Sequence, residues 1–555
     1  MDGRRTENIP DPATGAHLNP SNSHGGEETR KFSEIQIKQI QRLIRIGTAL
    51  SAERNIERLF EMIVEEAREF TGADGGTLYI MSDDETALQF AVVQTETLNI
   101  RNIRMGGTGG YITWKPVRLL NSEGLPNHEN VSAHVAFTGD SVNIPDVYDA
   151  EGFDFQGTRK FDAETGYRSK SMLVVPMKNH ENDIIGVLQL LNARNEERSE
   201  VISFSPECQE MTESLASQAA VALSNNRLIH DLEALMESFI RAIATAIDEK
   251  SPYTGGHVRR VAELTMDIAC KINDMMEGPY ADVRFSVDQM KELHTAAWLH
   301  DVGKVTSPEY LLDKATKLET IFDRIEILRL RFELCGLQAK LRKSNKKAIP
   351  ELAQTEQNDE TEKTLREEFH FLSDANNGSE PMSDEMMGKV SAIAARTWEL
   401  NGEREPLLSP DEVETLNIRQ GTLSAREREV IHNHAAMTYK ILSQLPFPKK
   451  LRHVPEYAAS HHETPNGKGY PRGLGAAQLS LQSRILALAD IFEALTAQDR
   501  PYKKGKTLSE AMHTLEIMVK DGYIDPDLYT LFQKEGIHLD YARRELSPEK
   551  IDSAG

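Results

Sequence analysis

Residues 461–471 read His461-His-Glu-Thr-Pro-Asn-Gly-Lys-Gly-Tyr-Pro471, an adjacent pair of histidines followed by a glycine-rich turn. Two further stretches place similar side chains in apolar surroundings. Leu299-His-Asp-Val-Gly-Lys304 closes an apolar helical stretch, and Asp490 lies within the apolar run 485–492. A carboxylate inside an apolar helix is costly unless it is paired or bound to a metal. Together these stretches predict a mostly helical C-terminal half that is built around a buried metal centre.

The histidine and aspartate side chains of this half form one candidate set of metal ligands. Imidazole and carboxylate donors suit iron, manganese, zinc or nickel, and no thiolate stands beside them to change that preference. Isolated histidines are more often ordinary core or surface residues, and His294, His432 and His453 are interpreted in this way. The candidate ligands are His257, His300, Asp301, His434, His461, His462 and Asp490.

The overall composition excludes several classes of protein. The chain has 555 residues, enough for about three or four units, and its net charge of −23 disfavours binding to DNA or RNA. The cysteines Cys208, Cys270 and Cys335 lie far apart, which fits a reducing cytoplasm. Residues 1–30 lack the apolar core of a signal peptide, and no run reaches the roughly 18 apolar residues of a membrane span. We therefore expect a cytoplasmic protein with no membrane partner.

The N-terminal half is predicted to be an α+β domain. Residues 1–31 are rich in Asn, Pro, Gly, Ser and Glu and are predicted to be a disordered tail. Helical periodicity follows up to about Phe70, and apolar or β-branched runs at 75–80, 88–93, 142–145, 171–177 and 184–191 predict the strands of one antiparallel sheet. The predicted domain, with its leading helix, covers residues 32–205.

Residues 206–247 are predicted to form one long connecting helix, because no proline or glycine follows Pro206 in this stretch. Apolar side chains recur at alternating steps of four and three residues, which is the spacing of a coiled-coil seam. The seam comprises Leu228, Leu232, Leu235, Phe239, Ala242 and Ala246. We expect a parallel homodimer through this helix; the alternative is a helix that packs on its own domain.

Residues 248–540 are predicted to be an all-α domain with an insertion at about 319–420. The insertion contains a charged run from Lys340 to Glu368 and an apolar stretch from Met386 to Trp398. We interpret it as a helical hairpin with a flexible middle. Residues 541–555 are predicted to be a tail.

The histidine and aspartate motifs resemble those of a known family. Residues 299–304 look like the HD signature of metal-dependent phosphohydrolases, and residues 461–471 match the HHExxxGxGYP signature of the HD-GYP subfamily at every fixed position. Pro252-Tyr-Thr-Gly-Gly-His257 resembles the opening motif of that subfamily. Ala489-Asp-Ile-Phe-Glu-Ala-Leu-Thr496 and Asp499-Arg-Pro-Tyr-Lys503 resemble its closing motifs. The resemblance covers about residues 235–540, interrupted by the insertion.

This resemblance implies a helical bundle that binds two or three divalent metal ions, often iron or manganese. The implied ligands are His300, Asp301, His434, His461, His462 and Asp490, with Asp301 bridging two ions. A third ion, found in some members, uses a carboxylate that Asp248 or Glu249 would supply here, where a glutamate is expected. His257 would be a ligand or lie directly behind one.

The same resemblance implies a phosphodiesterase for a cyclic dinucleotide, either cyclic di-GMP or cyclic GMP-AMP. A hydroxide that bridges two metal ions would attack phosphorus, with Asp301 and Lys304 as the catalytic residues. Lys304 stands one turn after Asp301 and would neutralise the phosphate. The substrate would be held by Lys304, Gly469, Tyr470, Arg500 and Lys503; the alternative for the basic run 500–506 is a solvated loop. Thr464 stands where many members have arginine.

The N-terminal domain resembles a GAF domain more loosely. Asp146-Val-Tyr148 and Phe161-Asp-Ala-Glu-Thr-Gly-Tyr-Arg168 look like the GAF domains of cyclic-nucleotide phosphodiesterases and cyclases. Of their N-K-F-D-E signature, Asn192 and Phe204 fit, whereas Ala193 replaces the lysine and Glu207-Cys208 replace the acidic pair. The resemblance implies a ligand site at Asp146, Asn192 and Phe204, with a cyclic nucleotide as the candidate ligand. The alternatives are another small ligand or a dimerisation domain without a ligand.

Two other interpretations of the C-terminal domain stay open. The first is an HD hydrolase of another nucleotide, which the complete GYP loop disfavours. The second is a receptor that binds a cyclic dinucleotide without turnover, which the complete set of matched ligands disfavours. In the cyclic-dinucleotide interpretation, a ligand of the N-terminal domain is expected to shift the pair of connecting helices and change access to the metal site.

Overall fold

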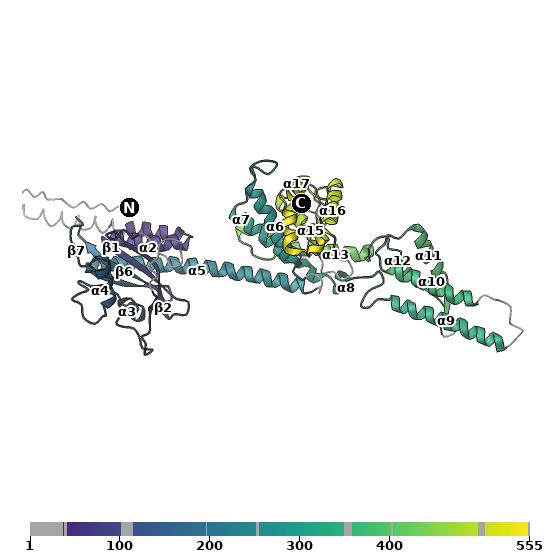
Figure 1. Ribbon diagram of the computed structural model, residues 1–555, viewed down its shortest axis with the longest axis horizontal. Helices are drawn as coiled ribbons and strands as arrows, with labels where there is room; N and C mark the ends of the chain where they lie inside the picture. Colours follow the sequence, from purple (N-terminus) through teal and green to yellow (C-terminus); the bar gives the residue numbers. More distant parts are fainter. Residues whose placement is uncertain are drawn as a thin grey trace, which may run out of the picture. The chain divides into compact units, whose positions relative to one another are not determined.

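The computed structural model describes residue 37 and residues 41–100, 115–195, 197–250, 255–348, 358–400, 403–497 and 505–552. The chain forms two compact units, Met1–Ala234 and Leu235–Gly555 (Figure 1). The predicted fold class is confirmed. The first unit holds an antiparallel sheet with helices, the long helix α5 (Pro206–Asp248) follows, and the described part of the second unit is helical apart from one two-stranded sheet. None of the described helices is long and apolar enough to cross a membrane.

The sheet of the first unit has the strand order β3-β2-β1-β6-β5-β4, with β7 paired to β6. Alternate side chains of a strand face opposite sides of the sheet, so β1 and β6 contribute to two cores. Leu78 and Leu188 pack on one side, whereas Tyr79 and Val187 pack on the other. The strands are β1 (Ala73–Met81), β2 (Ala87–Thr95), β3 (Val117–Arg118), β4 (Val142–Ile144), β5 (Met172–Lys178), β6 (Ile184–Arg194) and β7 (Val201–Ile202), and all their pairings are antiparallel.

Helices cover both faces of this sheet (Figure 1). Helix α2 (Ile56–Thr71) begins at Asn55, whose side chain accepts two backbone N–H groups of the first turn. Ile63 of α2 and Leu215 of α5 pack in the same apolar cluster on one face. Helix α3 (Val131–Thr138) packs Val135 against the other face, and α4 spans Gln156–Thr165.

Helix α5 belongs to the first unit up to Ala234 and to the second from Leu235. The seam predicted from its heptad spacing faces solvent in the single chain, since Leu228, Leu232 and Phe239 are 57%, 67% and 60% exposed. Other positions of α5 do pack on the chain itself, through Leu215 in the first unit and Ile240 in the second, so both interpretations of the helix stay open. The homodimer itself stays a prediction.

The helices of the second unit surround one large apolar cluster that includes Val261, Leu293, Phe492 and Phe532. A smaller cluster joins the end of α5 to its neighbours through Ile240, Ala296 and Val454. The helices of this unit outside the insertion are α6 (His257–Asp274), α7 (Val287–Leu299), η1 (Val302–Thr306), α8 (Glu309–Leu312), α13 (Ala425–Leu442), η3 (Lys449–Leu451), α14 (Val454–Ala459), α15 (Leu481–Thr496), α16 (Leu508–Lys520), α17 (Pro526–Lys534), α18 (Ile537–Glu545) and η4 (Pro548–Lys550).

The folded part continues past residue 540, where the sequence predicts its end. Tyr541 and Ala542 of α18 are 1% and 0% exposed and belong to the large apolar cluster, as does Leu546. The prediction of a tail is therefore wrong for residues 541–551. The cause is a short amphipathic helix whose few apolar positions are easily missed beside its charged residues.

The insertion is larger in structure than the predicted helical hairpin. It contains α9 (Ile325–Ala348), α10 (Asn358–Asn376), α11 (Asp384–Ala394), a hairpin of β8 (Thr397–Leu400) and β9 (Glu403–Pro406), and α12 (Pro410–Leu416). These elements share an apolar cluster with Leu328, Phe332 and Leu372. The predicted flexible middle is helical at 340–348 and 358–368, and residues 349–357 lie outside the described residues.

Candidate metal centre

The candidate ligands come from segments that are far apart in the sequence and meet in the second unit. His257 is the first residue of α6, and His300 and Asp301 follow α7. His434 lies in α13, and Asp490 lies in α15. His461 and His462 follow α14. Most of these side chains are buried, which the apolar context of the sequence predicted.

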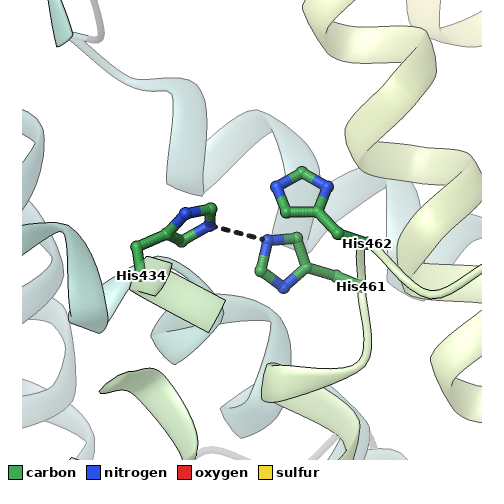
Figure 2. A group of neighbouring side chains, drawn as sticks. All are labelled: His434, His461 and His462. Atoms are coloured by element: carbon green, nitrogen blue, oxygen red, sulfur yellow. Dashed lines mark hydrogen bonds between the residues drawn. The ribbon is translucent and has the colours of Figure 1, made fainter. Parts of the chain in front are cut away.

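The side chains gather into two groups. The ligand atoms of His434, His461 and His462 lie within 4.8 Å of one another, and so do those of His257, His300 and Asp301. Figure 2 shows the first group, whose three rings point toward one another from α13 and from the segment after α14. Two metal positions side by side would suit this arrangement.

Asp301 faces both groups. Its Oδ1 lies 3.5 Å from Nε2 of His434, and its Oδ2 lies 3.3 Å from Nε2 of His300. Asp490 approaches from α15, with Oδ1 3.4 Å from Nε2 of His257 and Oδ2 3.9 Å from Nδ1 of His462. Asp301 has one oxygen near each group, which is the arrangement that a bridging ligand requires.

Backbone carbonyls set the tautomer of three histidines. Nδ1 of His300, His434 and His461 lies 2.7, 2.6 and 2.6 Å from the carbonyl oxygen of the residue three positions earlier. A carbonyl oxygen only accepts, so Nδ1 carries the proton and the lone pair of the neutral ring is on Nε2. Nε2 of His434 and Nε2 of His461 then face each other at 3.4 Å, as the dashed line in Figure 2 marks. Two facing acceptors favour a cation between them.

Two buried atoms of the group support the same conclusion. Nε2 of His300 and Oδ1 of Asp301 have no hydrogen-bond partner among the described residues. Burying such atoms without a partner costs free energy that a bound metal would recover. The donor set therefore fits divalent metal ions, with Nε2 and carboxylate oxygens as ligand atoms.

Electrostatics keep His461, His462 and Asp301 in the form that binds metal. Burial, reinforced by His462 and His300, lowers the pKa of His461 well below its usual range, and burial lowers the pKa of His462 to about 3. Burial alone would raise the pKa of Asp301, but Lys304 and His300 outweigh it and hold that pKa well below the ordinary value. Neutral imidazole and ionised carboxylate are the states that coordinate metal. For His257 and His300, burial alone would lower the pKa, but the neighbouring carboxylates outweigh it and raise the pKa of both rings.

Of the two residues predicted to supply a carboxylate for an additional ion, Asp248 and Glu249, Asp248 is the better placed. Asp248 is buried, and its Oδ2 accepts the backbone N–H of Val258 at 3.3 Å, next to His257. Glu249 is exposed. Asp248 is shorter than the expected glutamate by one methylene group, so the number of ions stays a prediction.

The glycine-rich loop packs against the histidine groups. The ring of Tyr470 stacks on that of His432 at 3.9 Å and lies 4.7 Å from that of His462. A Cβ on Gly469 would lie 2.5 Å from the carbonyl oxygen of His462, so only glycine fits there. Lys304 lies at the same centre, with Nζ 2.5 Å from Oδ2 of Asp301.

The sequence analysis assigned no site role to several residues that shape the site. His432, interpreted as an ordinary residue, holds the ring of Tyr470. Glu463 is buried and accepts the backbone N–H groups of Arg472 and Leu474, which fixes the loop. Glu493 contacts His257 and stands one turn after Asp490, a spacing that could have revealed it. Of the predicted substrate residues, Arg500 and Lys503 lie outside the described residues.

The described part of the first unit contains a cavity. That cavity has a volume of about 510 Å³ and is lined by residues that include Thr77, Gln94, Glu129, Phe161 and Tyr167. Asp146, Asn192 and Phe204 are not among the residues that line this cavity, and their contact with a ligand stays a prediction.

The side chains of Asp146, Asn192 and Phe204 make contacts within the fold. The Asn192 side chain accepts the N–H of Lys170 and donates to the carbonyl of Arg168. Asp146 accepts the N–H of Tyr148, and Phe204 packs in the core on the α2 face.

Comparison with known proteins gives matches in both units. Residues 55–223 match the GAF domain, and two models of the HD domain match residues 254–376 and 407–528. The 3'3'-cGAMP-specific phosphodiesterase 1 of Vibrio cholerae serotype O1 is 39% identical over 111 residues, which are 20% of this chain and 25% of that protein. The cyclic di-GMP phosphodiesterase of Thermotoga maritima is 34% identical over 139 residues, which are 25% of this chain and 37% of that protein.

The chain thus spans a quarter and about a third of the lengths of these two relatives. The resemblance predicted from the sequence is confirmed: the chain carries a GAF domain in its N-terminal part and matches the HD domain in its C-terminal part.

Proposed function

We propose that this chain, with its GAF and HD domains, is a metal-dependent phosphodiesterase that hydrolyses a cyclic dinucleotide, either cyclic di-GMP or cyclic GMP-AMP. The observation that carries the proposal is the meeting of two histidine groups at one shared carboxylate, Asp301, beside the loop of Tyr470. The activities named for the two relatives support the class of substrate.

The proposed ligands are His300, Asp301, His434, His461, His462 and Asp490, with His257 beside His300 and Asp301 and with Asp248 at an additional position. Divalent ions, iron or manganese by resemblance, supply Lewis acidity toward phosphoryl oxygens and lower the pKa of a water molecule. The protein contributes the orientation of the rings. Because the carbonyls of Ala297, Ile431 and Ala458 accept from Nδ1, each ring offers Nε2 to the centre without reorganisation.

Lys304 is proposed to act on the phosphate. Its ammonium group lies beside Asp301 and is a quarter exposed, so a phosphoryl oxygen bound at the centre would come within reach. The positive charge would neutralise the phosphate and stabilise the leaving oxygen. Tyr470 would contact a nucleobase of the substrate through its ring or its hydroxyl group. Gly469 lets the loop lie close to the backbone of His462. Arg500 and Lys503 would add cations from the segment after α15.

We propose that the GAF domain regulates this activity through a parallel dimer along α5. The exposed seam of Leu228, Leu232, Leu235 and Phe239 supports the pairing. The cavity of about 510 Å³ is large enough for a small molecule. A cyclic nucleotide is the first ligand to test, although the described lining includes carboxylates, Glu129 and Asp154, and no cation to meet its phosphate.

Turnover by the full chain tests the proposal. Anaerobically purified protein would be assayed on cyclic di-GMP and cyclic GMP-AMP, with metal content measured on the same sample. The matched pair of variants is Asp301→Ala, at the shared carboxylate, and Asp540→Ala, at an exposed ion pair with Arg543. Hydrolysis that is lost only in Asp301→Ala supports the enzyme and ranks the substrates. Metal-loaded protein that binds either dinucleotide without turnover would make it a receptor, and turnover of a different nucleotide alone would change the substrate class.

A further inference from the structure

His257 is held differently from the other histidines of the centre. As the first residue of α6 it has no preceding helical turn to offer a carbonyl to its ring. Its Nδ1 instead lies 2.5 Å from Oε2 of Glu493. The Glu493 side chain is fully buried in the second unit, so the contact is not a chance surface pairing.

The other oxygen of Glu493 is fixed as well. Oε1 accepts from the guanidinium of Arg260, at 2.8 Å from Nε and 2.7 Å from Nη2. Arg260 stands one turn after His257 on α6, and Glu493 stands one turn after Asp490 on α15. The carboxylate is therefore clamped between the two helices, and its charge is balanced by Arg260.

This clamp directs the far end of the ring. Nε2 of His257 lies 3.4 Å from Oδ2 of Asp301 and 3.4 Å from Oδ1 of Asp490. A carboxylate at Nδ1 keeps the proton on that nitrogen and raises the basicity of Nε2, as a carboxylate behind a metal-bound histidine does. Nε2 then faces the space that the two aspartates share.

We propose that Glu493 is the positioning residue that makes His257 a metal ligand, and that it thereby sets the occupancy of the metal position beside His300 and Asp301. The inference rests on the metal centre of the proposed function. It concerns one position only, because the group of His434, His461 and His462 is oriented by backbone carbonyls and, for His462, by Asp490. Loss of Glu493 should weaken one ion and leave the other.

The test is a double-mutant cycle read by metal binding. Full-length protein would be loaded with Mn²⁺ and dialysed, and ions per chain and their dissociation constants would be measured for Glu493→Gln, His257→Ala and the double variant. We expect Glu493→Gln to weaken one site by about tenfold or more. In the His257→Ala background the same change should have no further effect, because the residue acts through that ring.

The matched control is Glu292→Gln. Glu292 is also a buried glutamate beside a histidine, since it accepts the backbone N–H of His453 at 2.7 Å and lies 3.4 Å from its Nδ1, but it stands outside the centre. Thermal unfolding of each metal-free variant would separate a local effect from loss of fold. Glu292→Gln should leave both metal affinities unchanged.

Two results would overturn the inference: unchanged Mn²⁺ affinity in Glu493→Gln, or an equal loss with and without His257, which would mark a structural role. Neither result depends on turnover. A chain that hydrolyses cyclic dinucleotides while Glu493→Gln binds metal normally keeps the proposed function and loses this inference. A chain without turnover in which the cycle shows coupling keeps the inference and loses the function.

Discussion

Replacing Gly303 by alanine tests whether the fit of η1 against α13 creates the centre. Gly303 stands between Asp301 and Lys304, and its N–H donates to Oγ1 of Thr438 at 3.0 Å. A Cβ at this position would lie 1.9 Å from the carbonyl oxygen of His434 and 2.6 Å from the amide nitrogen of Thr438. Both of these atoms belong to the backbone of α13, so no side-chain rotation can relieve the overlap.

The size of the effect follows from these distances. Non-bonded heavy atoms pack at about 3.5 Å, so α13 and η1 must separate by roughly 1.5 Å at this point. Such a shift moves His434 away from Asp301, whose Oδ1 is 3.5 Å from its Nε2. Metal–ligand distances tolerate only about 0.2 Å. We expect loss of at least one ion per chain, a fall in turnover of about 100-fold or more, and a cost of about 1–3 kcal/mol in stability.

The assay measures ions per chain, turnover of the preferred dinucleotide and thermal unfolding on the same preparations. Gly388→Ala is the control, because Gly388 lies inside α11 and a Cβ there would meet nothing within 4 Å. That change should raise stability by roughly 0.5–1 kcal/mol through helix propensity and leave metal and turnover unchanged. A Gly303→Ala protein with wild-type metal content and turnover within twofold of wild type would refute the reasoning.

Three further predictions concern other parts of the chain. Lys317 is 1% exposed, and burial lowers its pKa from 10.5 to about 8, so the unfolded state binds the proton more tightly than the folded state. The stability of the wild type relative to Lys317→Met should therefore increase as the pH rises from about 8 to about 10.5. Parallel pH profiles of the two unfolding temperatures would contradict this prediction. Leu232→Glu should convert a dimer to a monomer in sedimentation, whereas His230→Glu, off the seam, should not; a monomeric wild type would remove the dimer. Removal of bound metal by a chelator should lower the unfolding temperature, and added Mn²⁺ should restore it. The reason is that an ion that binds only the folded state stabilises that state by about 2.7 kcal/mol at 100 times its dissociation constant. An unfolding temperature that the chelator leaves unchanged would argue against a metal-loaded centre.

The sequence predicted a buried centre of histidine and aspartate because the signals for it lie in short stretches of consecutive residues. His300, Asp301 and Asp490 stand in apolar stretches where a polar side chain needs a strong partner, and the structure brings them together. Strands β1, β2, β4, β5 and β6 of the first unit were also predicted, since apolar or β-branched runs bounded by turns mark them in the sequence. In both cases a short run of consecutive residues is enough to predict which side chains are buried.

What the sequence did not reveal depends on contacts between distant segments. Glu493 looks like any acidic residue of a helix until α6 brings His257 and Arg260 against it. Asn192 lies in β6 with a φ of 56°, and its side chain bonds to the backbone of Arg168 and Lys170, contacts that the signature in the sequence did not reveal. The hairpin of β8 and β9 was missed because strands of four residues carry too little periodicity.

The direction of each helix explains why His300 and His461 take backbone acceptors whereas His257 takes a buried glutamate. The last carbonyls of a helix lack intrahelical partners, so α7 and α14 end with acceptors that are free for a ring placed just beyond them. His300 and His461 use those of Ala297 and Ala458. A helix begins with free N–H donors instead, and a ring at the start of α6 finds no acceptor in its own helix. His257 must therefore take its acceptor from another helix, and Glu493 on α15 meets that requirement while Asp490, one turn earlier, faces the opposite end of the same ring.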